Sequence, residues 1–96
     1  MWSFDENGKF KLLDTSNDNK DAVECLAAGE NTKIIFSGSK DGSILNFNFS
    51  ENKFKLIETL LGHTERVETI AFDDINDMLF SGSYDNTIRI WTKSED

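Results

Sequence analysis

The chain lacks proline altogether and has one cysteine among its 96 residues. A single thiol cannot form an intrachain disulfide, and this cysteine usage is typical of proteins in a reducing compartment. Cys25 lies in the apolar-rich run ECLAA, which favours a buried packing role over nucleophilic chemistry. These features predict a cytoplasmic or otherwise intracellular protein.

The sequence also lacks a long apolar run and a basic cluster. No stretch approaches the ~18 apolar residues of a membrane-spanning helix, and the start MWSFDENGKF has no apolar signal-peptide core. Eighteen acidic and ten basic residues give a net charge of −8, with the two signs interspersed. No Lys/Arg cluster accompanies the aromatic residues, as a nucleic-acid groove requires. We therefore expect no membrane and no nucleic-acid binding, and interpret the acidic excess as a solvated surface.

What the sequence does contain is an internal repeat. The segment AVECLAAGENTKIIFSGSKDGSILNFNF (22–49) aligns without a gap with RVETIAFDDINDMLFSGSYDNTIRIWTK (66–93), at an offset of 44 residues. The same offset pairs KFKL at 9–12 with KFKL at 53–56. A fixed period in this range indicates a repeat architecture, in which each unit buries its apolar faces only against its neighbours.

Each repeat is composed of short β-rich runs separated by turn signals. Residues of the second repeat from 67 onward alternate with the two-residue period of a strand, and Val, Ile, Phe and Thr dominate the runs. Polar turns at 73–77 and 84–86 separate them. The sequence therefore predicts an all-β chain of eight strands in two four-stranded antiparallel meanders. In the second repeat we expect strands at 53–60, 67–72, 78–83 and 87–92.

The second repeat resembles the WD-repeat family of β-propellers. Its Gly62 and His63, the run LFSGSYDNTIRIW and the spacing between them match the family's hallmark of a Gly-His near the start and a Trp-Asp at the end of ~40–45 residues. The closing dipeptide here is Trp91-Thr92. The first repeat departs further, because Asn19 stands at the His position and Phe47 at the closing Trp position.

The resemblance implies a division of the chain into propeller blades. Residues 9–49 would be a degenerate first blade and 50–96 a second one, with 1–8 the exit from a preceding blade or an N-terminal extension, because Trp2 looks like a closing Trp. Each repeat would begin with the family's outermost strand. Closed propellers have at least four blades. We therefore expect an incomplete propeller unless other chains or further sequence complete it.

The resemblance also implies a buried set of hydrogen-bonded side chains: His63, Ser81, Asp85 and Trp91. In the first repeat, Asn19 and Phe47 predict a broken relay. Ser, His and Asp are also the residue types of a hydrolase triad, but no nucleophile elbow or oxyanion loop accompanies them, so we predict no enzyme activity and no cofactor.

Residues 14–25 resemble a calcium-binding loop only faintly. Asn19 stands where such a loop needs glycine, and Cys25 stands where it needs glutamate. We therefore interpret 14–18 as an exposed acidic turn and predict no metal site.

Propellers of this family act as rigid platforms for partner proteins. By resemblance, one face would present Arg66, Glu68 and Tyr84 from the second repeat, and Glu24 and Lys40 from the first. Arg and Tyr are residue types that dominate binding hot spots. Our leading hypothesis is therefore a non-enzymatic scaffold for protein–protein interaction.

Two alternatives stay open. The chain could be a self-assembling two-blade subunit that closes a propeller by homo-oligomerisation, with three copies supplying six blades and four supplying eight. It could also be the substrate-recruiting propeller fragment of a larger modular protein, such as a ubiquitin-ligase component.

Overall fold

The computed structural model describes residues 2–4 and 8–93, and in these residues the chain forms nine β-strands and no helix. The all-β prediction is confirmed. Within the described residues, no helix is therefore long and apolar enough to cross a bilayer. The strands are β1 (Trp2–Phe4), β2 (Phe10–Leu12), β3 (Val23–Ala28), β4 (Ile34–Ser39), β5 (Ile44–Ser50), β6 (Lys53–Leu60), β7 (Val67–Asp73), β8 (Met78–Ser83) and β9 (Ile88–Thr92).

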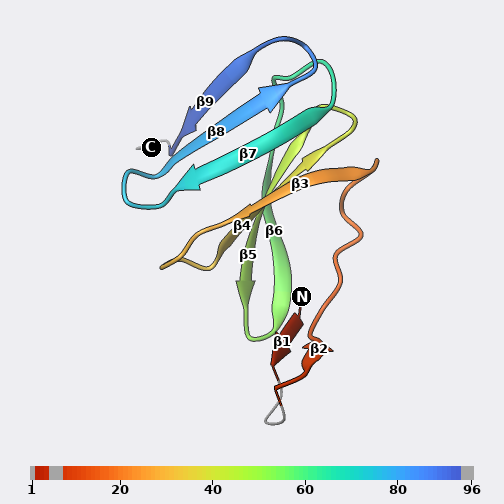
Figure 1. Cartoon of the computed structure of the whole chain (residues 1–96), viewed down its shortest axis with the longest axis vertical. Helices are drawn as coiled ribbons and strands as arrows, with labels where there is room; N and C mark the ends of the chain where they lie inside the picture. Colours follow the sequence, from red (N-terminus) through yellow and green to blue (C-terminus); the bar gives the residue numbers. More distant parts are fainter. Residues whose placement is uncertain (1, 5–7, 94–96) are drawn as a thin grey trace.

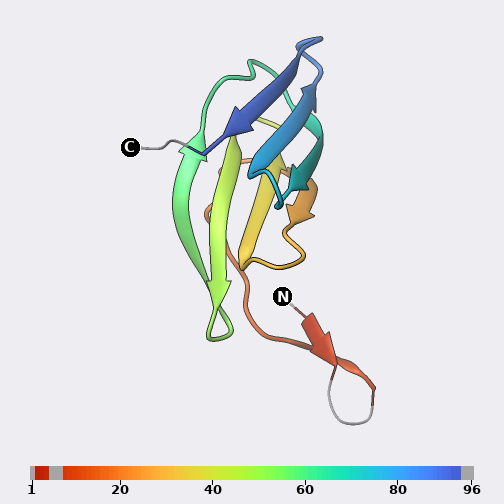
Figure 2. The ribbon, with the colours of Figure 1, turned by 90° about the vertical axis from the view of Figure 1, so that its left-hand side faces the viewer.

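The strands form three antiparallel sheets. The larger sheet has the order β3-β4-β5-β6, the smaller one β7-β8-β9, and β1 pairs with β2 alone. The two main sheets pack on each other, whereas the β1–β2 hairpin and β9 lie at opposite ends of the molecule (Figures 1 and 2). The smaller sheet has three strands among the described residues, because β6, the predicted outermost strand that opens the second repeat, belongs to the larger sheet.

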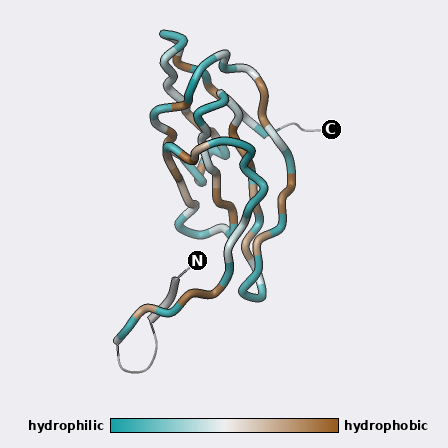
Figure 3. The backbone as a smooth tube through the Cα atoms, turned by 90° about the vertical axis from the view of Figure 1, so that its right-hand side faces the viewer, coloured by the Kyte–Doolittle hydropathy of each residue, from teal (hydrophilic) through white to brown (hydrophobic). Residues whose placement is uncertain are grey.

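The sheets are shifted by one strand relative to the sequence repeats. β6 opens the second repeat, yet it pairs with β5 of the first. The connection is a tight hairpin turn in which Glu51 and Asn52 both have positive φ, 52° and 65°. Two such residues match the right-handed twist of the flanking strands, so the turn fixes β6 beside β5. Figure 3 shows this turn as a hydrophilic stretch between more apolar strands.

The β1–β2 ladder repeats the outer ladder of the larger sheet. In the latter, Leu56 of β6 lies opposite Phe47 of β5. In the former, Leu12, the counterpart of Leu56 at the 44-residue offset, lies opposite Trp2. The backbone register therefore places Trp2 at the ladder position of Phe47, which is the counterpart of the closing Trp91. Residues 1 and 5–7 of the predicted 1–8 segment lie outside the described residues.

The core lies between the two main sheets. It is made of apolar side chains from both: Phe36, Ile44, Val67, Ile70 and Leu79. Val67 of β7 is fully buried against β4, at a place where that strand has Gly38. A Cβ atom on Gly38 would come within 2.8 Å of Val67 Cγ1 and 2.5 Å of Cys25 Sγ. Glycine at 38 therefore permits the close approach of the sheets.

We expect Gly38→Ala to lower the free energy of unfolding by about 1–3 kcal/mol, because the added methyl overpacks this contact. Gly82 is the counterpart of Gly38, and a Cβ there would meet only Thr69 Cγ2, at 3.2 Å. Gly82→Ala should therefore cost less when both variants are compared by urea denaturation in dilute solution. Equal losses would show that the approach of Val67 to Gly38 is not the limiting contact.

Candidate functional site: a buried tetrad and the Arg66 surface

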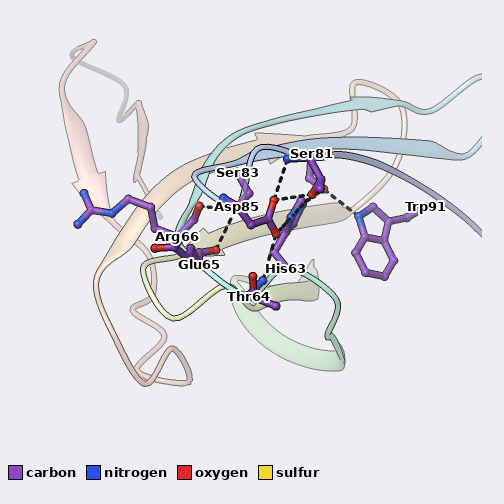
Figure 4. A network of polar contacts seen from close by, with 9 residues as sticks. His63, Thr64, Glu65, Arg66, Ser81, Ser83, Asp85 and Trp91 are labelled. Atoms are coloured by element: carbon purple, nitrogen blue, oxygen red, sulfur yellow. Dashed lines mark hydrogen bonds and ion pairs between the residues drawn. The ribbon is translucent and has the colours of Figure 1, made fainter.

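The structure brings the four predicted tetrad residues together from four parts of the second repeat. His63 lies in the link from β6 to β7, Ser81 in β8, Asp85 in the β8–β9 turn, and Trp91 in β9. Figure 4 shows their side chains converging. Within the first repeat the same places hold Asn19 and Phe47 in the positions of His63 and Trp91.

The tetrad is a continuous chain of hydrogen bonds. His63 Nδ1 lies 2.9 Å from Asp85 Oδ2, His63 Nε2 lies 2.7 Å from Ser81 Oγ, and Trp91 Nε1 donates to Ser81 Oγ at 2.9 Å. Because an ionised carboxylate only accepts, Nδ1 carries the hydrogen of the bond to Asp85, and in this tautomer Nε2 accepts from the Ser81 hydroxyl. Each polar side-chain atom of the tetrad then has a partner, which is the condition under which a buried network stiffens a fold.

Asp85 is the acceptor on which the network ends. The Thr87 hydroxyl, His63 and the backbone N–H groups of Thr64 and Thr87 all donate to its carboxylate, and together they hold the pKa of Asp85 well below its usual value. The structural partners Thr64 and Thr87 were missed by the sequence analysis. The sequence contained a signal for Thr87, because a hydroxyl residue follows the aspartate by two positions in both repeats, as Ser43 after Asp41 and Thr87 after Asp85. In the structure Ser43 donates to Asp41 in the same way.

The network does not present a nucleophile. Ser81 is only 2% exposed, and its O–H group already donates to His63 while its oxygen accepts from Trp91. Cys25, the only thiol, is half-buried, and burial raises its pKa. Among the residues 2–4 and 8–93, no group of three or more His, Cys, Asp or Glu side chains is placed to hold a metal ion.

The first repeat retains part of the relay. The Ser37 hydroxyl donates to Asn19 Oδ1 at 3.0 Å. The prediction that Asn19 breaks the relay is therefore wrong for this link, because the amide oxygen replaces the accepting nitrogen of an imidazole. The link toward Asp41 is absent from the described contacts, since Asn19 Nδ2 is buried with no hydrogen-bond partner. Phe47 has no N–H to donate.

Four of the five predicted partner-binding residues meet around one guanidinium. Arg66 Cζ lies 4.9 Å from the centroid of the Tyr84 ring, Arg66 Nη1 lies 3.6 Å from Glu24 Oε1, and Arg66 Nε lies 3.9 Å from Glu68 Oε1. We call Glu24, Arg66, Glu68 and Tyr84 the Arg66 surface. Arg66 extends away from the tetrad (Figure 4).

The backbone explains how the Arg66 surface is positioned. The N–H of Tyr84 donates to the carbonyl of Arg66, and the Ser83 hydroxyl donates to the carbonyls of Glu65 and Arg66. These bonds tie the β8–β9 turn to the start of β7. Lys40, the fifth predicted residue, lies in the equivalent turn of the larger sheet, where its N–H donates to the carbonyl of Ala22. Ala22 stands where the second repeat has Arg66, and Lys40 stands where it has Tyr84. The first repeat therefore lacks both members of the Arg66–Tyr84 stack.

Two packed antiparallel meanders, with a buried His-Ser-Asp-Trp relay in one of them, define a pair of β-propeller blades. The family model described as WD domain, G-beta repeat matches residues 10–48 and 54–92. The chain belongs to this WD-repeat family, whose members generally serve as scaffolds for protein interaction.

Solved structures share the fold. The crystal structure of the computationally designed Ika4 protein is 26% identical, with a TM-score of 0.69 over 81% of this chain and 45% of Ika4. Sqt1 of Saccharomyces cerevisiae is 18% identical, with a TM-score of 0.70 over 76% of this chain and 20% of Sqt1. The chain thus spans less than half the length of either. No curated protein matches the sequence.

We expect Trp91→Ala to lower the free energy of unfolding by about 3–5 kcal/mol, as truncation of a packed aromatic residue does. Trp91→Phe keeps most of the ring volume and removes the N–H donor, so it should cost about 1 kcal/mol. Urea denaturation of both variants measures the two losses. A free energy of unfolding of Trp91→Ala equal to that of the wild type would contradict the structural role of the tetrad.

The stabilising effect of Asp85 should depend on pH. Because its folded-state pKa is depressed, its contribution is complete above the unfolded-state pKa of about 4 and is lost as the pH falls toward the folded-state value. The difference in unfolding free energy between the wild type and Asp85→Asn should therefore be largest near neutral pH and shrink below about pH 4. Urea titrations at pH 7, 5 and 3 measure this difference, and a constant value would contradict the assignment.

Proposed function

We propose that the chain is a non-enzymatic docking platform and that the Arg66 surface is the place where a partner protein binds. The observation that carries this proposal is the arrangement of the Arg66 guanidinium between the Tyr84 ring and two carboxylates. These contacts leave Tyr84 57% exposed. A large aromatic side chain that is exposed and already oriented loses little entropy when a partner covers it.

The charge of the surface indicates the chemistry of the partner. Arg66 is already paired with Glu24 and Glu68, and the neighbouring Glu65 is exposed. The surface therefore offers more carboxylate than cation, on a chain whose net charge is −8. We infer a partner segment that carries Lys or Arg and packs an apolar group on the Tyr84 ring. Such an encounter is steered by opposite charges and weakens as salt is added.

A scaffold role also agrees with the tetrad. The four side chains link the β6–β7 connection to β8 and β9, which positions Arg66 and Tyr84 on a rigid support. The intracellular location expected from the cysteine usage remains part of the proposal.

Tyr84→Ala and Arg66→Ala should each lower the yield of bound partner at least tenfold, with little change in thermal stability, because both side chains lie at the surface. The measurement is quantitative mass spectrometry of proteins captured by the purified chain. Tyr84→Phe is the matched control, since it keeps the ring under Arg66. Recovery of the same proteins at equal yield by the wild type and both alanine variants would rule out the Arg66 surface.

A further inference from the structure

The contact between the two main sheets has a knob and a hole. The knob is Val67, at the start of β7, which is fully buried. The hole is the surface of β4 at Gly38, where Val67 Cγ1 would lie within 2.8 Å of an added Cβ. Ile44 of β5, also fully buried, packs in the same cluster as Val67.

The chain carries a second knob and a second hole that are not filled. Val23 is the counterpart of Val67, has the same bulged register against the next strand, and is 50% exposed. Gly82 and Ile88 are the counterparts of Gly38 and Ile44. They line a hollow of about 160 Å³ on the smaller sheet, together with Ile70 and Phe80. Ile88 is 80% exposed, whereas Ile44 is fully buried.

The edges of the sheets are complementary in the same way. β9 pairs with β8 in the register in which β5 pairs with β4, shifted by 44 residues. The place beside β9 that corresponds to β6 holds no strand among residues 2–4 and 8–93. β2 carries the FKL sequence that β6 also contains, and within the chain it pairs with β1, whose Trp2-Ser3 resembles the Trp91-Thr92 of β9.

The free strand β2 and the open edge at β9 belong to opposite ends of the molecule. The β1–β2 hairpin lies far from β9 in both views, although β3, which carries Val23, contacts β7 (Figures 1 and 2). In this conformation β2 therefore does not reach β9 of its own chain. The largest dimension of the molecule is 45 Å. A second copy, in contrast, can present Val23 and β2, which have the same separation along the sequence as Val67 and the matching part of β6.

We propose that the chain self-associates head to tail by repeating its own internal sheet contact. Val23 of one copy fills the hollow at Gly82 and Ile88 of the next. β2 of the first copy leaves β1 and pairs with β9 of the second, placing Leu12 opposite Trp91 as Leu56 lies opposite Phe47. The occupant of the open face is therefore a second copy of this chain.

The exchange has identifiable costs and gains. It breaks the three-residue β1–β2 ladder and the bond from the Phe54 N–H to Asp14 Oδ2, which is 2.8 Å long. It allows β2 to lengthen toward the eight residues of β6, because the counterparts of 57–60 are 13–16. A contact between two different surfaces repeats until a ring closes or a filament grows.

Light scattering on a sizing column tests the self-association. We expect a species whose mass is an integral multiple of 10.9 kDa. The fraction of the protein in this species should increase with protein concentration. Val23→Asp and Ile88→Lys each place a charge at one half of the contact, on an exposed side chain, and should reduce the assembled fraction at least tenfold. Ile75→Lys is the matched control: Ile75 is 87% exposed in the β7–β8 turn, outside the contact.

A wild-type chain that stays monomeric up to about 1 mM, with native circular dichroism, would overturn the proposal. Assembly that survives both Val23→Asp and Ile88→Lys would overturn the assigned contact. Assembly lost equally in Ile75→Lys would also count against it, because the removal of any exposed apolar side chain would then explain the result. Tyr84→Ala should leave the mass unchanged, which separates this contact from the Arg66 surface.

Paired cysteines test the exchange of strands in a Cys25→Ala background. Lys11 is the counterpart of Lys55, and Thr92 that of Asn48, which lie opposite each other. Lys11→Cys with Thr92→Cys should therefore give disulfide-linked multimers on oxidation. Ser3→Cys with Lys11→Cys joins residues that are opposite within one chain, and oxidation should trap monomers that reassemble on reduction. The exchange would be refuted if oxidation of the Lys11→Cys/Thr92→Cys variant gave no disulfide-linked multimers. It would also be refuted if oxidation of the Ser3→Cys/Lys11→Cys variant left the mass of the assembly unchanged.

Discussion

The close approach of the two sheets at Gly38 is the constraint on which the rest of this structure depends. A four-stranded sheet cannot bury both of its faces alone, and here the larger sheet covers one face with Val67 and Ile70 of its neighbour. The absence of a side chain at residue 38 brings β7 near enough for Val67 to be fully buried. The start of β7 is thereby fixed, and with it the neighbouring link that carries His63 and Arg66.

The tetrad and the Arg66 surface are two consequences of the same placement. Inward from the β6–β7 link, His63 joins Ser81 and Asp85 in a network whose polar atoms are all paired. Outward from it, Arg66 lies over Tyr84. The tetrad supplies rigidity and the Arg66 surface supplies chemistry for recognition. A change that breaks the tetrad should therefore also disturb the positions of Arg66 and Tyr84.

Much of the fold could be predicted from the sequence, because alternating β-branched residues and polar turns repeat at a fixed offset. The four strands of the second repeat are found within one residue of the predicted bounds. The assignment of strands to sheets did not follow from this pattern. The family resemblance alone implied that each repeat opens with an outermost strand, and in the structure the turn at Glu51 and Asn52 fixes β6 beside β5. At the site, the link between Ser37 and Asn19 was missed because an amide can replace one side of an imidazole.

The shift between repeats and sheets has a consequence for the order in which the chain becomes structured during synthesis. The larger sheet takes its outer strand, β6, and the cover of its core, Val67, from the following repeat. When the ribosome has completed the first repeat, that sheet still lacks both. Native structure can therefore form only after translation has run well into the second repeat, and a pause at the repeat boundary would leave an apolar face and an open edge for chaperones to shield.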